Sequence, residues 1–242
     1  MTVLTRRHFL QSTAAACTVA GLPAWAADAF PTKPLTLVVP YPAGGASDAS
    51  ARIFAESFTQ SFKQQVIVEN YGGGTGLIGA NKVLSAPADG YTFLHGSPNE
   101  VILPPMLNPA ARYKPSDFVF SAPITTASIV LMVRNGFAVN TMDEFLDYAR
   151  AQKDKPLTYA SVGIDSLYHL MGDALAARLK LPFLHVPYKG AAPALQDLAG
   201  GQVDFAILAY QTSFDGMQEQ GRLKIVSSFS KDMAPGLKHI AP

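Results

Sequence analysis

The sequence predicts an α/β fold, and two observations support this fold class. From Leu35 onward, short apolar runs alternate with stretches of helical periodicity, which is the pattern of βα repeats around a mostly parallel sheet. The 242 residues are 48% apolar and 15% charged, which is long and apolar enough for one or two ordinary cores. We therefore expect a globular protein built from βα units.

The first α/β unit is expected to span residues 27–125. Its first strand is Leu35–Val39, and a turn from Pro40 to Gly45 follows it. Asp48 then opens a helix, because the apolar residues after it recur at three- and four-residue spacing. Two further strands are expected at 65–69 and 91–94, with a short helix at 80–85 between them.

The second unit is expected to span residues 126–229. Thr141 and Glu144 have capping-box spacing and mark the start of its first helix. The alternation then continues, with strands at 129–133, 157–161, 183–187, 203–208 and 224–229 and with further helices near 166–179, 190–199 and 212–220.

The N-terminal 26 residues are typical of a twin-arginine signal peptide. A Thr-Arg-Arg-His-Phe-Leu pattern begins at Thr5, an apolar stretch runs over 14–22, and Ala24-Trp25-Ala26 is a small-x-small cleavage site. The alternative is a basic N-terminus that runs into a short core helix. An apolar run this short cannot remain as a membrane anchor, so we expect cleavage after about Ala26 and release into the periplasm.

Cleavage would change the charge and the cysteine content of the chain. The 19 basic residues lose Arg6 and Arg7, which leaves 17 against 18 acidic residues, a net charge of −1. This balance argues against nucleic acid as a partner. Cys17, the only cysteine, would leave with the signal, so the mature chain has no disulfide and no thiolate metal site. Lipidation of Cys17 is the alternative, although Ala14 stands where a lipoprotein signal usually carries leucine.

The segment from Tyr41 to Asp48 is a candidate anion-binding loop. Its glycines lie between the end of a strand and the start of a helix, where backbone N–H groups are free to meet a carboxylate. The alternative is an ordinary βα turn capped by Ser47 or Asp48.

The segment from Ser161 to His169 repeats this logic in the second unit. A strand ends at a small polar loop and a helix begins, and Ser161 and Ser166 can both donate to an oxygen. His169 lies one helical turn beyond Ser166. Two such loops, one from each unit, are what a protein needs to hold a ligand in a cleft between domains.

Catalytic and cofactor motifs are weaker. Gly74–Gly79 fits G-x-G-x-x-G, but it follows the second strand and lacks a clear acidic partner for a ribose, so we favour a tight packing turn over a nucleotide site. A Ser-His-Asp catalytic triad could assemble in space from Ser161, His169 and Asp48, but no local sequence signature supports it. The histidines lack metal-ligand spacing. We therefore predict no enzyme activity, no cofactor and no metal; an exported oxidoreductase or other enzyme with a nucleotide cofactor is the alternative.

At these residues the chain resembles the solute receptors of tripartite tricarboxylate transporters, the Bug family of periplasmic binding proteins. The resemblance runs from about Phe30 to Pro242. Its landmarks are KPLTLVVPYPAGGASD (33–48), VIVEN (66–70), the glycine loop 72–79, ADGYTFLHGS (88–97), the 161–169 loop, HVPYKG (185–190) and GGQVD (200–204).

The resemblance implies a two-domain fold like that of type II periplasmic binding proteins, with one ligand in the cleft and no chemistry performed on it. A segment from about residue 230 would return to the first domain, and a monomer would work with the membrane subunits of a transporter. The ligand-binding residues that it implies are Tyr41, Ala43, Gly44, Gly45, Asp48, Ser97, Ser161, Gly163, Ser166, His169, Tyr188 and Tyr210.

Two departures from the family pattern affect the expected ligand. Asp165 stands where many relatives have glycine, and an acid beside a carboxylate site repels an anion unless it turns away or meets a ligand amine. We therefore expect either a small carboxylate or an amino-acid-like ligand. Relatives also continue for about another half-domain, so the first domain is expected to be incomplete, and a truncated chain that no longer binds is a further alternative.

Overall fold

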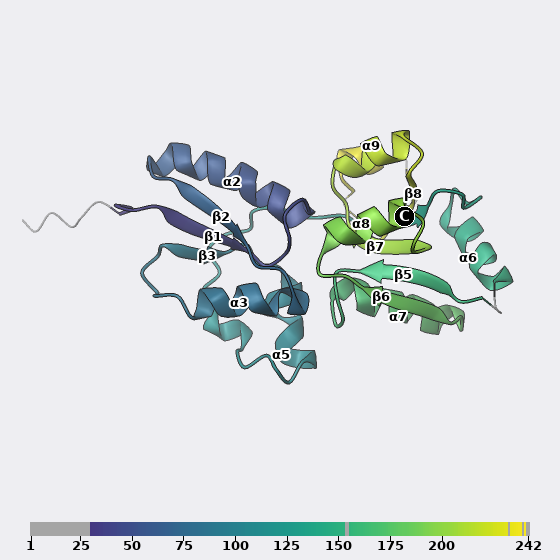
Figure 1. Ribbon diagram of the computed structural model, residues 1–242, viewed down its shortest axis with the longest axis horizontal. Coiled ribbons are helices and arrows are strands. Elements are labelled where there is room, and N and C mark those ends of the chain that lie inside the picture. The colour runs from purple at the N-terminus through teal and green to yellow at the C-terminus, as the bar shows by residue number, and fades with distance from the viewer. Residues whose placement is uncertain (1–29, 153–154, 232, 239, 241–242) are drawn as a thin grey trace, which may run out of the picture. The chain divides into compact units, whose positions relative to one another are not determined.

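The computed structural model describes residues 30–152, 155–231, 233–238 and 240, and the signal peptide expected at 1–26 lies outside them. From Lys33 onward the chain forms one compact unit. It contains a three-stranded and a five-stranded sheet, each with its own helices (Figure 1). This arrangement confirms the α/β class.

The first sheet is parallel and has the order β2-β1-β3. Its strands are β1 (Leu35–Val39), β2 (Val66–Asn70) and β3 (Thr92–Leu94). The central strand is a nearly continuous buried apolar run because both faces of the sheet are covered. Helix α2 (Ala46–Phe62) packs on β1 and β2, and α3 (Leu77–Leu84) packs on β1 and β3 from the other side (Figure 1).

Short helical pieces around the first sheet were not predicted. They are the 3-10 turn η1 (Gly74–Gly76) before α3, the helices α4 (Pro98–Val101) and α5 (Leu103–Leu107) after β3, and the 3-10 turn η2 (Pro115–Asp117). Each is too short to show a helical period in the sequence.

The second sheet has the order β6-β5-β7-β4-β8. Its strands are β4 (Ile129–Arg134), β5 (Leu157–Ser161), β6 (Phe183–Pro187), β7 (Phe205–Ala209) and β8 (Leu223–Ser228). Strand β4 runs antiparallel to both of its neighbours, whereas β5 pairs with β6 and β7 in parallel. Two of the four strand pairings are therefore antiparallel, because β4 is reversed, so the expected mostly parallel pairing holds for the first sheet but not for the second.

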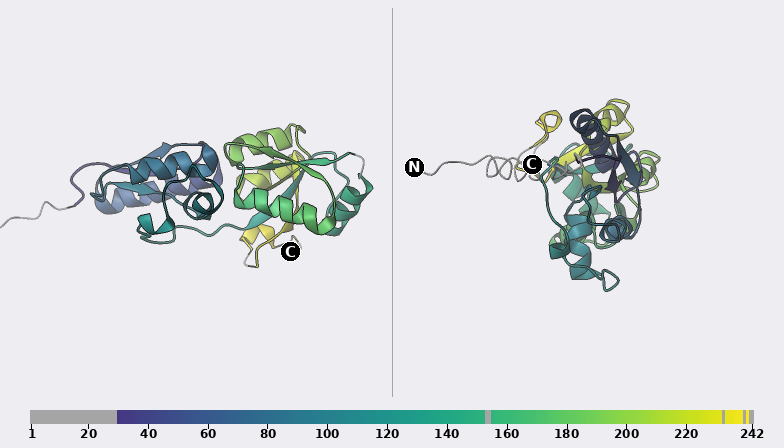
Figure 2. Two further views of the ribbon diagram at one scale, coloured as in Figure 1. Left: turned by 90° about the horizontal axis from the view of Figure 1, so that it is seen from below. Right: turned by 90° about the vertical axis from the view of Figure 1, so that its left-hand side faces the viewer.

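Helices cover both faces of the second sheet (Figure 2). Apolar residues of α8 (Ala191–Ala199) and α9 (Ser213–Glu219) share a core with Met132 and Leu208. The opposite face, with Leu131 and Phe205, packs against α6 (Met142–Ala151) and α7 (Leu167–Leu179). Neighbouring residues of one strand thus point into different cores.

Some predicted boundaries are wrong. Helix α2 begins at Ala46 rather than Asp48, and α3 begins at Leu77 rather than residue 80. Thr141 caps α6 as predicted by accepting from the Glu144 amide at 3.3 Å. The Glu144 carboxylate, however, accepts from the amide of Asn140 at 2.5 Å and not from that of Thr141.

The strands of the two sheets fall within the two predicted domains, 27–125 and 126–229. The division into domains remains a prediction. The described segment after β8 includes the 3-10 turn η3 (Pro235–Leu237), and its Ala234 amide donates to the Ser128 hydroxyl at 3.0 Å, just before β4. A return from about residue 230 to the first domain also remains a prediction.

Candidate functional site

The loop after β1 brings the predicted residues Tyr41 to Asp48 to the start of α2. Ala43 and Gly44 are exposed, and Gly44 has a φ of +87°, a conformation that favours glycine. The Gly44 amide donates to the carboxylate of Asp48 at 3.0 Å. Asp48 therefore closes the turn from inside the helix.

The Asp48 carboxylate is buried and fully engaged. It accepts from Arg52 Nε at 3.1 Å and from Asn70 Nδ2 at 3.0 Å, in addition to the Gly44 amide. Burial opposes its charge, but these hydrogen bonds, with that from Arg52 first, outweigh burial and lower the pKa of Asp48 below its usual value. Its oxygens hold the loop in shape.

Two helix N-termini approach one another at this loop. Gly45 is the N-cap of α2 and Gly190 is the N-cap of α8, and neither helix has a side-chain cap. The alternative of a helix capped by Ser47 or Asp48 is therefore wrong, because Gly45 stands at the N-cap and Asp48 bonds to the Gly44 amide from within the helix. A Cβ placed on Gly44 would lie 3.8 Å from the Cβ of Ala192, in the first turn of α8. Uncapped N-termini offer N–H groups and a partial positive charge to an anion.

The second predicted loop begins with Ser161, which ends β5 and is fully buried. Its hydroxyl contacts the Gly163 carbonyl at 3.0 Å, the Gly163 amide at 3.1 Å and His185 Nε2 at 2.7 Å. Gly163 has a φ of +138°, and a Cβ there would lie 2.7 Å from the Thr75 hydroxyl. A side chain at this position would strain the backbone and collide with Thr75.

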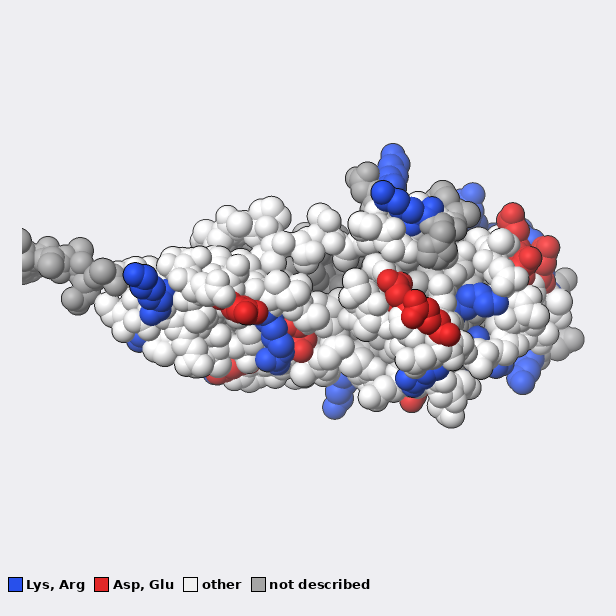
Figure 3. All heavy atoms as spheres, turned by 90° about the horizontal axis from the view of Figure 1, so that it is seen from above, with Lys and Arg blue, Asp and Glu red and all other residues white. Residues whose placement is uncertain are grey.

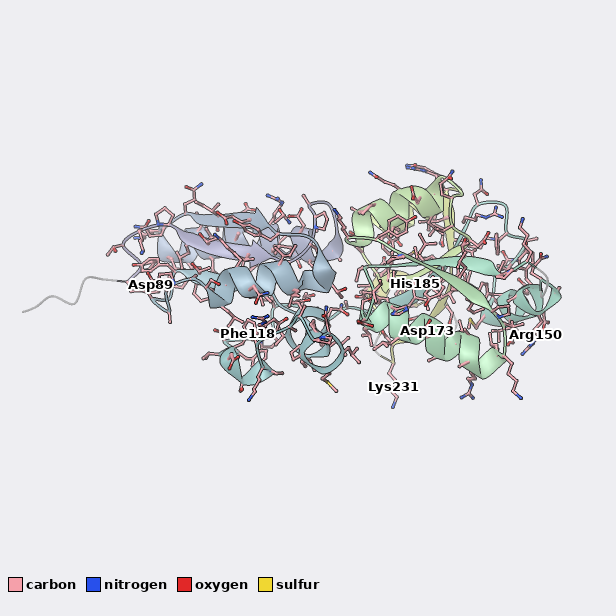
Figure 4. All side chains as sticks on the ribbon, turned by 60° about the horizontal axis from the view of Figure 1, so that its bottom comes forward. Asp89, Phe118, Arg150, Asp173, His185 and Lys231 are labelled. Atoms are coloured by element: carbon pink, nitrogen blue, oxygen red, sulfur yellow. The ribbon has the colours of Figure 1, made fainter. Side chains whose placement is uncertain are left out.

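Ser166 and His169 lie at the N-terminus of α7 and form its first side-chain contacts. The buried Ser166 hydroxyl accepts from the His169 amide at 3.2 Å and caps the helix. His169 Nδ1 accepts from the Asp165 amide at 3.1 Å, and its Nε2 faces Asp173 at 3.3 Å. The His169 ring stacks on His185 with 4.0 Å between centroids, and Figure 4 shows His185 close to Asp173.

These contacts do not connect Ser161, His169 and Asp48 into a Ser-His-Asp triad. Ser161 bonds to His185 rather than to His169, and Asp48 is bound to Arg52 and Asn70. Nor does any interaction found in the described residues connect the three members.

Asp165 has a φ of +61°, in the left-handed region. Glycine adopts this conformation without strain, and aspartate is among the other residues that tolerate it. The residue is only partly exposed, and its amide is bound to His169.

The other predicted ligand contacts each bond to a nearby acid. The Ser97 hydroxyl donates to Glu100 at 3.0 Å, Tyr188 donates to Asp197 at 2.6 Å, and Tyr210 donates to Asp215 at 2.6 Å. Burial, followed by the Asp215 hydrogen bond and charge, raises the pKa of Tyr210 to about 12. Burial and then Asp197 likewise raise the pKa of Tyr188. Both phenols therefore stay protonated at neutral pH.

Four residues join the predicted loops and were not among the predicted contacts: Thr75, Asn99, Glu100 and His185. Thr75 Oγ1 donates to the Ile164 carbonyl at 2.6 Å. Asn99 Oδ1 accepts from the Leu167 amide at 2.8 Å, beside Ser166. The one sequence signal for this group is Ser97-Pro98-Asn99-Glu100, which has capping-box spacing directly after a strand.

The glycines of the G-x-G-x-x-G segment are explained by conformation and close packing. Gly74 and Gly76 have positive φ, and a Cβ on Gly76 would collide with Glu100. A Cβ on Gly79 would lie 2.7 Å from the backbone of Pro40. These observations support a tight packing turn. They give no support to a nucleotide-binding site.

A hollow of about 630 Å³ lies elsewhere, as an open groove between α2 and the edge strand β2. None of the predicted ligand contacts lines it. Within the described residues no group of three or more His, Cys, Asp or Glu side chains is placed to hold a metal ion.

Figure 3 shows acidic and basic side chains in several small, separate groups on the face drawn, some of them with the two signs side by side. None of the helices in the described part of the chain is both long enough and apolar enough to span a bilayer.

Comparison with known proteins identifies the family. The model of the tripartite tricarboxylate transporter family receptor matches residues 50–241. A protein of a Pseudomonas species, named UPF0065 protein in the tcbD-tcbE intergenic region, is 39% identical over 203 residues. That match covers 84% of this chain and 60% of the relative, so the chain spans less than two thirds of the relative's length.

Solved structures agree with this match. The periplasmic binding protein BugD is 32% identical, with a TM-score of 0.74 over 88% of this chain and 70% of that one. MatC of Rhodopseudomonas palustris, solved with bound malate, is 28% identical, with a TM-score of 0.75 over 88% of this chain and 72% of that one. The sequence match and the shared fold together show that this chain belongs to the receptor family of the tripartite tricarboxylate transporters.

Proposed function

We propose that this chain is a solute-binding receptor that captures a small carboxylate or amino-acid-like ligand for a tripartite tricarboxylate-type transporter. Family membership supports this role, as does the malate bound to MatC. A second R. palustris protein with the same fold, 29% identical with a TM-score of 0.75, was solved with adipate.

One observation in this chain carries the proposal: two helix N-termini without side-chain caps meet at Gly44 and Ala192. A carboxylate between them would receive backbone N–H groups and the positive ends of two helix dipoles. We propose that the ligand's carboxylate binds there and that its other end meets the 161–169 loop. Asp165 is the group in that loop that would favour a ligand amine.

Calorimetry of residues 27–242 against malate, adipate and aspartate tests this proposal. The variant Ala192→Asp is designed to abolish binding, because it places a negative charge in the first turn of α8. An acid at that position stabilises a helix, so the loss of binding would not come from unfolding. We expect the Kd to rise by more than tenfold.

Ala174→Asp, on the exposed side of α7, is the matched control and should leave the Kd unchanged. If the folded wild-type protein binds none of the three ligands, the receptor proposal loses its support and a chain that no longer binds becomes the better account. If Ala192→Asp binds as well as Ala174→Asp, the carboxylate lies elsewhere.

We also propose that the receptor works in the periplasm as a monomer, after twin-arginine export and cleavage near Ala26. The ordered signal features in the sequence support export. Mass spectrometry of the exported protein under native conditions would report the new N-terminus, the oligomeric state and any retained ligand. A mature protein that still carries residue 17 would contradict the cleavage site.

A further inference from the structure

The carboxyl group of Glu100 is completely buried on the short helix α4. Its Oε2 accepts from the Tyr41 hydroxyl at 2.9 Å and from the Ser97 hydroxyl at 3.0 Å, and its Oε1 accepts from the Ser97 amide. None of the ion pairs found among the described residues involves Glu100. A buried carboxylate without a cation is costly to ionise.

The groups packed around this carboxyl are neutral at pH 7. Tyr41 faces it from the loop after β1, Tyr113 from the segment after α5, Tyr168 from α7, and Gly76 from the turn before α3. Burial raises the pKa of Glu100 to about 7, even though the hydrogen bonds from Ser97 and Tyr41 favour its charged form. Near neutral pH the group is therefore close to half ionised.

Glu100 also lies between the two candidate binding loops. It holds the side chains of Tyr41 and Ser97, both predicted ligand contacts, and its neighbour Asn99 accepts from the Leu167 amide beside Ser166. An anion that binds at these loops would meet a charge of the same sign on Glu100 across a region of low dielectric. Protonation of Glu100 removes that repulsion.

We propose that Glu100 is a positioning residue of the binding site and that an anionic ligand binds together with one proton, which Glu100 takes up. This inference rests on the proposed function. It deepens that function by making capture of a carboxylate sensitive to pH.

Calorimetry with malate from pH 6.5 to 8.5 tests the coupling. Both carboxyl groups of malate are ionised throughout this range, so the ligand itself does not titrate. The Kd should rise by about tenfold across the range, because a linked proton must be supplied at higher pH. Parallel titrations at pH 7.5 in phosphate and in Tris, which differ in ionisation enthalpy, should report an uptake of about 0.7 proton.

The variant Glu100→Gln is expected to lose both the pH dependence and the proton uptake while still binding malate. Glu69→Gln is its matched control, because Glu69 also accepts from a tyrosine, Tyr71, at 2.9 Å. The control should behave as the wild type does. A residue with only a structural role would change the melting temperature without removing the pH dependence.

The outcomes separate this inference from the proposed function. Wild-type protein that binds malate with the same Kd at every pH and takes up no proton overturns the inference and leaves the receptor intact. A pH dependence that persists in Glu100→Gln also overturns it and assigns the proton to another group. Should Glu100→Gln fail to fold, infrared difference spectra of the wild type with and without malate decide the question, because protonation of Glu100 adds a carboxylic acid C=O band and uptake by a histidine does not. If malate, adipate and aspartate all fail to bind at any pH, the proposed function itself has failed.

Discussion

The hydroxyl oxygen of Ser161 lies 2.7 Å from Nε2 of His185, on the adjacent strand β6. Ser161 also contacts the carbonyl and the amide of Gly163. A hydroxyl has one proton and two lone pairs, so all three contacts are satisfied when Ser161 donates to the carbonyl and accepts from the amide and from His185. Neutral His185 then carries its proton on Nε2.

This arrangement predicts a loss of stability in mild acid. Burial, followed by the charge of neighbouring His169, lowers the pKa of His185 to about 4, whereas an unfolded histidine titrates near 6.5. As pH falls below 6.5 the unfolded state takes up this proton first, so stability declines from pH 6.5 towards pH 4. Because the side chain is partly exposed, we expect the free energy of unfolding to fall by only about 1 kcal/mol at pH 5.

Urea unfolding of the wild type and of His185→Gln at pH 6.5 and 5.0 measures this contribution, since other titrating groups cancel in the difference. The wild type should lose about 1 kcal/mol more than the variant. An NMR titration that finds His185 protonated at pH 6 would contradict the prediction.

Thr75→Val should weaken ligand binding through the bond between the candidate loops. The substitution keeps the shape of the side chain and removes the donor to the Ile164 carbonyl. If ligand binding holds this bond closed while it opens and closes in the free protein, its loss costs up to about 1 kcal/mol of binding, or up to about fivefold in the Kd for malate. Calorimetry measures the change.

Thr59→Val is the control, because the Thr59 hydroxyl also donates to a backbone carbonyl, that of Ala55, at 2.8 Å, but lies on α2 away from the loops. It should lower the melting temperature and leave the Kd unchanged. Equal Kd values for the two variants would show that the Thr75 bond plays no part in binding.

The strands of this fold were predictable because burial leaves a direct signal in the sequence. Leu35–Val39 and Leu157–Ser161 are apolar runs of strand length, and the structure has the same limits. The reversal of β4 was not predictable, because an apolar run does not reveal strand direction. Helices α4 and α5 were missed because four or five residues cannot show a helical period.

The candidate site was predicted through its loops and less through its side chains. Glycines and small polar residues marked where strands end, but not that the Asp48 carboxylate turns inward to Gly44. Glu100 was missed because its partner Tyr41 lies 59 residues away, and no local pattern joins them. Long-range pairs of this kind appear only once the sheet has brought the loops together.

Asp48→Asn should destabilise the protein at neutral pH but not in acid. Asp48 contributes charge-assisted hydrogen bonds to the Gly44 amide, Arg52 and Asn70, and their weakening should cost about 1 to 3 kcal/mol at pH 7. Its folded pKa is lowered, so this stability is present above the unfolded value near 4 and is lost as pH falls through the lower, folded value. Urea unfolding of the wild type and of Asp48→Asn at pH 7 and pH 3 measures the cost of the substitution at each pH.

The gap between the wild type and Asp48→Asn should therefore narrow at pH 3. Asp147→Asn, which breaks an exposed pair with Arg150, should change stability by less than about 0.5 kcal/mol at either pH. A gap of the same size at both pH values would mean that the Asp48 charge contributes nothing.

Alanine substitutions at two helical glycines should change the stability of the protein in opposite directions. A Cβ on Gly172, in α7, would collide with the ring of Tyr159, which is buried and held by Asp173 at 2.7 Å. Gly172→Ala should cost about 1 to 3 kcal/mol, because relief of this overlap must shift either a buried ring or the helix. Gly216, in α9, has nothing within 4 Å of a built Cβ.

Gly216→Ala should therefore raise stability by up to about 1 kcal/mol, because alanine has the higher helix propensity and no neighbour is disturbed. For a chain of this length that corresponds to a rise of about 2 to 4 °C in the melting temperature. Calorimetric melts of both variants check the pair together. Destabilisation by Gly216→Ala would mean that a neighbour packs against that face of α9, and tolerance of Gly172→Ala would mean that Tyr159 does not press on α7.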